Sequence, residues 1–193
     1  MTPHKRTRGI IANQRGMLSL EFALSMVIFV IGTIALAEAF SYFRTVSSMD
    51  RATYMVGQIL AQQKTLTGNN SGTTPDTTGF YWNQAQLIGK PMDLANNGAM
   101  IITVYQDPNG TQTPTQTLRA TFGLPIKSQI TPAALAPPFP FEPSDTTIVV
   151  ELYYRHPTFN AALRFWPGAA QFGSFYRIAY FRPRSTTFTV SNG

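Results

Sequence analysis

Two carboxylates stand out because they interrupt a long apolar stretch. Glu21 and Glu38 are the only charged residues in Met17–Phe43. A carboxylate near the centre of a bilayer costs about 3 kcal/mol, so a chain that keeps one there has a use for it. Gly16 immediately precedes the stretch, which makes Glu21 the fifth residue after that glycine. Glu21 is therefore the first candidate functional residue, and its expected chemistry is the pairing of an acid with a cation away from water.

Elsewhere the sequence offers little reactive chemistry. It has no cysteine, and its two histidines, His4 and His156, are far apart, so thiolate chemistry is excluded and a zinc site lacks ligands. The common catalytic and nucleotide-binding motifs do not occur. We therefore expect no enzymatic activity, no catalytic residue, no cofactor, no metal and no small-molecule substrate. We expect His156 to lie at the surface or in a hydrogen bond.

The net charge of +6 is concentrated at the N-terminus. Residues 1–16 carry four basic side chains and no acid, which leaves a net charge of +2 on the other residues. Nucleic-acid binding requires basic side chains spread over a folded face, so we expect no nucleic-acid partner. Basic residues directly before an apolar run are typical of a flank that stays in the cytoplasm, and they predict that the C-terminal part is exported.

Three interpretations of the apolar run compete. It is long enough to be a plain membrane anchor. It is also compatible with a signal peptide cleaved after Ala37, within Ala35-Leu36-Ala37, to leave a secreted or membrane-anchored binding module. The third interpretation is a prepilin, which its peptidase cuts after a glycine so that glutamate becomes the fifth residue. This one is favoured because it gives Glu21 a role, pairing with the α-amino group of a neighbouring subunit. Gly16–Met17 is then the cleaved bond.

The helical pattern continues beyond the apolar run. Apolar or small side chains recur with a period of 3.5 residues, which indicates one face of a helix. No proline occurs between Met17 and Lys64, so we predict one helix over about residues 17–64. Its first part, 17–43, would span the membrane, and 44–64 would be an amphipathic continuation. The residues of the stripe are Tyr42, Val46, Met49, Thr53, Val56 and Leu60.

Two uses of this stripe remain open: packing on the chain's own domain, which we favour for residues 46–60, or a seam against other subunits. A continuous helix also argues against cleavage after Ala37, because that cut would sever it.

Residues 65–193 read as a β-rich exported domain. The predicted fold is α+β, a long N-terminal transmembrane helix followed by a mostly antiparallel β-sheet. Segment 66–79 is expected to be a polar loop, and Phe80–Trp82 an aromatic anchor to the core. Segment 132–143, with five prolines, should be irregular or polyproline-like. The predicted strands are 99–106, 116–122, 146–154, 174–181 and 186–190, with a turn at 107–110 and a short helix at 158–166. The basic residues Arg177, Arg182 and Arg184 are expected on a solvated sheet face.

The N-terminal segment also resembles a known family. QRGMLSLEFALSMVIFVIGTIALAEAFSYF, residues 14–43, is similar to the N-terminus of TadE/TadF-like minor pilins (pseudopilins) of the tight-adherence, or Flp, type IV pilus system. These carry a basic leader ending in glycine, a Glu-Phe-Ala-like step, and often a second glutamate near the helix end. Gly16, Glu21–Leu24 and Glu38 match those positions, and residues 49–60 resemble the TadF branch.

The resemblance implies a structural subunit in the bacterial inner membrane. It would pass the membrane once, with a cytoplasmic N-terminus and a periplasmic C-terminal domain, or be incorporated in an extracellular pilus. Residues 1–16 would be a leader, and Gly16 and Met17 the pair cut by a prepilin peptidase. Glu21 would serve peptidase recognition and assembly, and Glu38 an intramembrane or interface role. The implied partners are the prepilin peptidase, other pilin or pseudopilin subunits, the inner membrane and the pilus assembly platform.

Overall fold

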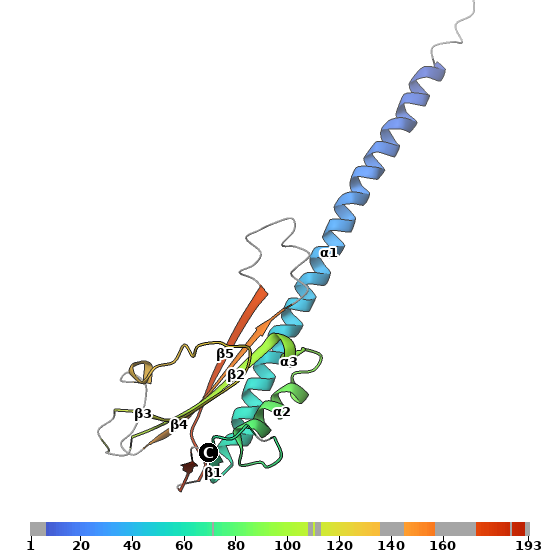
Figure 1. Ribbon diagram of the computed structural model, residues 1–193. Coiled ribbons are helices and arrows are strands. Elements are labelled where there is room, and N and C mark those ends of the chain that lie inside the picture. Colours follow the sequence, from blue (N-terminus) through green and yellow to red (C-terminus); the bar gives the residue numbers. More distant parts are fainter. Residues whose placement is uncertain are drawn as a thin grey trace, which may run out of the picture. The chain divides into compact units, whose positions relative to one another are not determined.

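The computed structural model describes residues 7–70, 72–107, 110, 113–135, 145–156, 173–185 and 187–191. The chain divides into two units, Met1–Phe43 and Arg44–Gly193. The predicted fold class is confirmed: a long apolar N-terminal helix is followed by a mostly antiparallel four-stranded sheet. Figure 1 shows these elements in chain order.

The N-terminal helix α1 runs from Thr7 to Ala61. It begins about ten residues earlier than the sequence predicts, and no proline occurs after Pro3 in residues 1–16 to stop the helix there. Within the apolar run, the Thr33 hydroxyl donates to the Phe29 carbonyl oxygen at 2.8 Å, so it needs no partner from outside the helix. After Ala61 the chain turns through bonds from the Gln62 and Gln63 amides to the Ile59 and Leu60 carbonyls.

The sheet has the strand order β3-β2-β4-β5, and every neighbouring pair is antiparallel. Its two central strands, β2 and β4, are almost entirely buried, whereas the edge strand β3 alternates between exposed and more buried residues and the edge strand β5 is mostly half-buried. Four of the five predicted strands are confirmed to within one residue at each end, whereas the fifth, predicted over 186–190, is the shorter strand β6, Thr189–Ser191. Of the predicted turn after β2, the Gly110 amide donates to the Asp107 carbonyl oxygen at 3.4 Å, with Gly110 at φ 64°. The bounds are β2 Gly98–Gln106, β3 Thr115–Gly123, β4 Thr146–Arg155 and β5 Ser174–Phe181.

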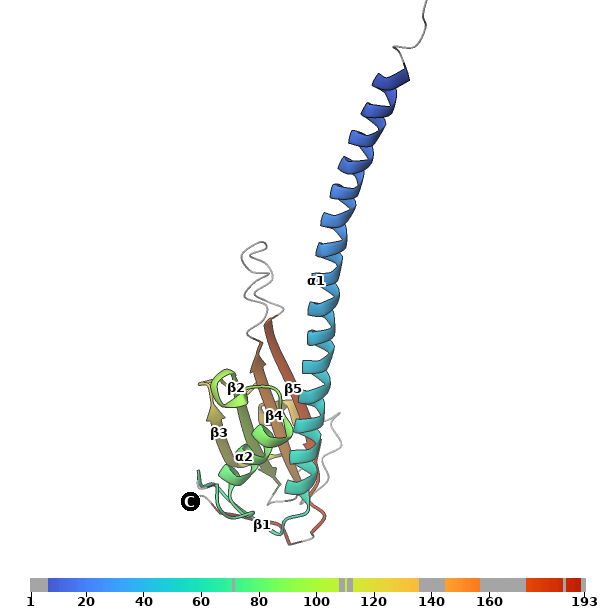
Figure 2. The same cartoon turned by 90° about the vertical axis from the view of Figure 1, so that its right-hand side faces the viewer.

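The main core lies between one face of this sheet and the helices. Met49, Val56 and Leu60 of α1 are fully buried there, which confirms that the stripe over residues 46–60 packs on the chain's own domain. Sheet residues of the same face, including Met100, Ile102 and Val150, complete the core. In Figure 2, α2 and the lower part of α1 are drawn along this sheet.

The sequence analysis missed several short elements. Helix α2, Thr78–Ile88, contains the predicted aromatic anchor: Tyr81 is fully buried, and Trp82 stacks on Phe122 with ring centroids 6.1 Å apart. The expected loop before it includes strand β1, Thr65–Thr67, which pairs in parallel with β6, Thr189–Ser191. Strands this short carry no readable periodicity, so their pairing depends on contacts distant in sequence. Two further short helices are α3, Leu94–Asn97, and η1, Pro132–Leu135.

Two predictions concern segments that the structure describes only in part or not at all. The short helix at 158–166 lies outside the described residues. Of the proline-rich segment, only Pro132–Leu135 is described, and it forms a 3-10 helix rather than an irregular or polyproline conformation. Pro132 can begin that helix because a helical first turn needs no amide donor at its first residue.

Candidate functional site

The predicted cleavage pair and the first acid lie together on an uncovered stretch of α1. Gly16 and Glu21 are exposed, and Met17 is 70% exposed. A Cβ added at Gly16 would meet nothing within 4 Å. The bond between Gly16 and Met17 lies inside the helix, so the predicted cleavage would require local unwinding of α1. Glycine makes such unwinding cheaper than alanine would, by about 1 kcal/mol.

The large apolar side chains around Glu21 are exposed within the structure. Leu20 is 74% and Phe22 is 70% exposed, and the apolar residues that follow are similar through Phe43. The helix from Gly16 is long and apolar enough to cross a membrane, and its most apolar window is not buried in the structure. An apolar surface of this length is unfavourable in water, so it requires lipid or other apolar helices around it.

Glu38 lies on the same helix but is not part of a common site with Glu21. The two residues are separated by about 26 Å along the helix axis at 1.5 Å per residue. Glu38 is half-buried, and its Oε2 atom is buried without a hydrogen-bond partner among the described residues. The structure therefore presents two separate carboxylates on α1.

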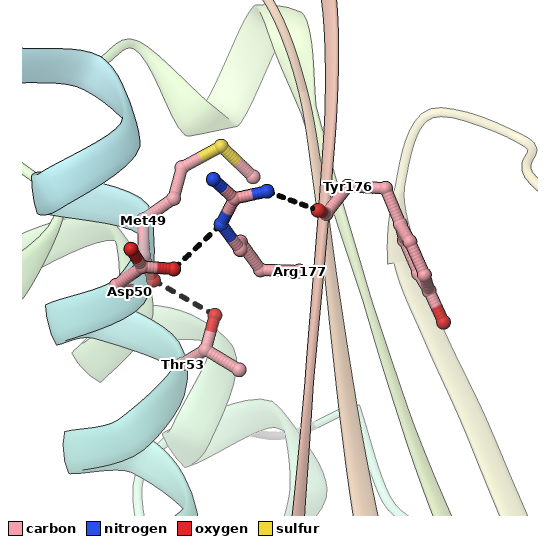
Figure 3. A network of polar contacts seen from close by, with 5 residues as sticks. All are labelled: Met49, Asp50, Thr53, Tyr176 and Arg177. Atoms are coloured by element: carbon pink, nitrogen blue, oxygen red, sulfur yellow. Dashed lines mark hydrogen bonds and ion pairs between the residues drawn. The ribbon is translucent and has the colours of Figure 1, made fainter. Parts of the chain in front are cut away.

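A second part of α1 is tied to the sheet by an ion pair. The Arg177 Nε atom on β5 lies 2.6 Å from Asp50 Oδ1 on α1, and Arg177 Nη1 donates to the Tyr176 carbonyl oxygen at 2.9 Å (Figure 3). Arg182 pairs in turn with Asp145 at 3.0 Å. Arg182 and Arg184 are exposed, whereas Arg177 is half-exposed and bridges helix and sheet. Its pair is partly exposed and is worth at most about 1 kcal/mol.

The sheet face opposite α1 holds a fully buried carboxylate that the sequence analysis did not select. Glu151 is 0% exposed, in the middle of β4. Its Oε2 accepts from the Ser128 hydroxyl at 2.5 Å, and its Oε1 accepts from the Gln129 amide at 2.9 Å. The hydroxyls of Tyr176 and Tyr153 donate to Oε1 at 3.0 and 3.3 Å. One acid inside an otherwise apolar strand is the signal that could have revealed it.

These bonds hold a loop against the sheet. The Tyr153 hydroxyl also lies 3.2 Å from the Lys127 carbonyl oxygen, and the Tyr105 hydroxyl donates to the Ile130 carbonyl oxygen at 3.1 Å. Arg119 on β3 reaches the same Ile130 oxygen and the Tyr105 hydroxyl. To this network the loop supplies main-chain groups and the Ser128 hydroxyl, while Ile126 and Ile130 add apolar contacts with the sheet. Glu151 is therefore a structural carboxylate that accepts from groups on several elements.

The tyrosines around Glu151 are expected to make the domain sensitive to alkali. Burial, with the Glu151 charge second, raises the pKa of Tyr153 to about 12, and the same causes raise the pKa of Tyr176. A raised pKa in the folded state stabilises the fold below the unfolded value of about 10, and that stability is lost as the pH rises through the folded value. The melting temperature of the full chain in detergent should fall between about pH 10 and 12.

The decline of the melting temperature with pH is to be compared between the Tyr153→Phe, Tyr176→Phe double variant and Tyr54→Phe. The Tyr54 variant is the control because Tyr54 is 56% exposed. The double variant should show a shallower decline over that range and the Tyr54 variant an unchanged one. Identical pH profiles for all three proteins would contradict the role given to burial and Glu151.

His156 belongs neither to the ion pair between α1 and the sheet nor to the hydrogen-bond network of Glu151. It is 9% exposed, so it is not at the surface. Its amide donates to the Gly173 carbonyl oxygen at 2.8 Å, and its ring lies edge-on to Tyr154 and Phe175. Among the described residues, no group of three or more His, Asp or Glu side chains is arranged to hold a metal ion.

Comparison of the chain with models of protein families, with curated proteins and with solved structures gave no match. The features that bear on function are therefore the chain's own: an exposed membrane-length helix with a carboxylate five residues after Gly16, followed by a β-sheet unit.

Proposed function

We propose that this protein is a minor pilin, or pseudopilin, of a tight-adherence type IV pilus, leaning to the TadF branch. In this proposal it is inserted in the bacterial inner membrane and processed by a prepilin peptidase between Gly16 and Met17. The observation that carries the proposal is the position of Glu21: an exposed acid in an uncovered apolar helix, five residues after an exposed glycine. The long apolar helix followed by a β-sheet unit is consistent with a pilin-like architecture.

The proposal gives each candidate residue a physical role. Cleavage would create a positive α-amino group on Met17. Glu21 could neutralise the corresponding amino group of a neighbouring subunit in a bundle of apolar helices, where a charge without a partner is costly. Glu38, whose Oε2 lacks a hydrogen-bond partner among the described residues, is the second candidate for a contact between subunits. No catalytic step is assigned to this chain.

The test is the intact mass of the membrane-fraction protein after co-expression with a matched prepilin peptidase. We expect a membrane-bound chain that starts at Met17. Gly16→Leu should abolish this processing, whereas Gly32→Leu should leave it unchanged. Gly32 is the matched control because a Cβ at either glycine meets nothing within 4 Å, so neither change disturbs packing within the chain.

The measured mass distinguishes this proposal from the other two interpretations of the apolar run. An uncut chain in the presence of active peptidase would remove the main support of the proposal and favour a plain anchor. A soluble product that starts at Glu38 would identify a secreted binding module instead. In the same system, Glu21→Ala should be inserted in the membrane but should impair pilus assembly; unchanged assembly would contradict the role given to Glu21.

A further inference from the structure

The two edges of the four-stranded sheet differ in how they are covered. On β5, Arg177 bonds to Asp50 of α1, and the Phe181 ring packs against Tyr54 with centroids 5.6 Å apart. β3 is the outermost strand of the sheet in both views (Figures 1 and 2). It contacts α2, α3 and β6, but among the described residues none is hydrogen-bonded to its outward main-chain groups. An open strand edge presents main-chain donors and acceptors that can pair with another strand.

The hydrogen-bonding pattern between β2 and β3 shows which main-chain groups of β3 point away from the sheet. The Leu124 amide donates to the Gly98 carbonyl oxygen at 3.0 Å, and the register pairs Phe122 with Met100. Since hydrogen-bonded pairs alternate along an antiparallel ladder, the even-numbered residues of β3 bond to β2 and the odd-numbered ones face away. The outward residues Arg119, Thr121 and Gly123 are exposed, and no described residue bonds to their outward main-chain groups.

The open segment is bounded at both ends. Thr117 has no register partner on β2, because Leu118 pairs with Val104 and Gln116 with Tyr105, although its hydroxyl donates to the Val104 carbonyl oxygen at 3.2 Å. Such a bulge interrupts pairing. At the other end Pro125 has no amide hydrogen and cannot donate to a ladder. Thr117 and Pro125 are equally distant from Thr121, so the segment is symmetric about that residue.

We propose that this edge pairs with the same edge of a second copy, antiparallel and centred on Thr121. In this register Thr121 faces the second copy's Thr121, and Arg119 faces Gly123. Every outward residue then takes part in a hydrogen-bonded pair, and the two interruptions, Thr117 and Pro125, lie opposite each other. No arginine faces an arginine, which avoids the repulsion that like charges cause across a strand pair.

The side chains of this edge are compatible with such pairing. Glycine opposite Arg119 leaves room for the arginine side chain, whose guanidinium stays on the Tyr105 hydroxyl and the Ile130 carbonyl oxygen. The open segment contains no lysine and no proline, which proteins commonly use to block an edge. The inference depends only on β3 and is independent of the proposed processing at Gly16.

A single-cysteine experiment tests the register directly, because the chain has no cysteine of its own. Opposed residues of a hydrogen-bonded pair have Cα atoms about 5.5 Å apart, within the range of a disulfide. Thr121→Cys in the full chain in detergent should therefore form a disulfide dimer on mild oxidation. Gln116→Cys is the matched control: it is also exposed on β3, but its copies would lie about 33 Å apart. We expect about tenfold more dimer for the first variant.

A second pair of variants tests the main-chain bonds. Thr121→Pro removes an outward donor, a change that edge strands tolerate, whereas Thr121→Ala keeps the donor. In sedimentation experiments the alanine variant should dimerise as the parent does and the proline variant should be monomeric. If the proline variant fails to fold, the crosslinking of the two cysteine variants tests the pairing instead. Two outcomes would overturn the proposal. One is equal crosslinking of Thr121→Cys and Gln116→Cys, and the other is crosslinking of Thr121→Cys only to a different protein.

Discussion

Glu151→Ala is expected to destabilise the Arg44–Gly193 unit by about 3–5 kcal/mol, or to prevent its folding. The change removes an acceptor that is 0% exposed and binds Ser128, Gln129 and two tyrosine hydroxyls. A buried donor left without a partner costs about 1–3 kcal/mol, and several would be left at once. The loop that carries Ser128 would also lose its attachment to β4.

The measurement is urea denaturation of the full chain in detergent, followed by tryptophan fluorescence, since Trp82 packs on Phe122 in the core. Glu151→Gln is the informative comparison: it keeps one acceptor oxygen but places an amide donor among donors, so an intermediate loss is expected. Asp50→Asn is the exposed control and should cost about 1 kcal/mol or less. A loss for Glu151→Ala no larger than that of Asp50→Asn would contradict the structural role of this carboxylate.

Gly57→Leu is expected to destabilise the same unit by about 2–3 kcal/mol, because it overpacks the contact between α1 and β5. A Cβ at Gly57 would already overlap the Phe181 ring, so even alanine has no room. Alanine in a helix interior otherwise gains about 1 kcal/mol over glycine. The clash reverses that preference, so we expect Gly57→Ala to be destabilising as well.

Gly32→Ala is the matched control, since it lies in the same helix and its Cβ would meet nothing within 4 Å. It should leave the midpoint of unfolding of the sheet unit unchanged. Phe181→Ala combined with Gly57→Leu should recover part of the lost stability, since the ring causes the clash. If Gly57→Ala is neutral or stabilising in urea denaturation, the helix can move away from β5 at low cost and the close contact is unimportant.

The long helix and the central strands of this fold were predictable from local sequence patterns. One helix through Met49, Val56 and Leu60 follows from a 3.5-residue stripe without proline, and those residues are buried as predicted. Strand β4 follows from its run of β-branched and aromatic residues. Helix α2 was missed because its aromatic cluster, which includes Tyr81 and Trp82, is too short to show a period.

The Glu151 carboxylate shows what local sequence patterns cannot predict: the partners of a side chain that come from distant segments. Its place in β4 was predicted, but its donors come from a loop, from β5 and from β4 itself. Loop residues such as Ser128 carry no periodicity, so nothing local indicates that they lie beside β4. The ion pair of Asp50 with Arg177, separated by 127 positions in the sequence, was hidden for the same reason.

By itself the sequence determined the α+β class, a helix of membrane length and the placement of Gly16, Glu21 and Glu38 along it. These properties depend on residue type and spacing within one segment, where each residue contacts its neighbours in sequence. Only the tertiary structure decided which side chains meet across segments: Glu151 with its loop, Gly57 with Phe181, and the free edge of β3. Those contacts depend on strand register and on the closeness of packed surfaces, and both are set by the whole unit rather than by any single stretch of the chain.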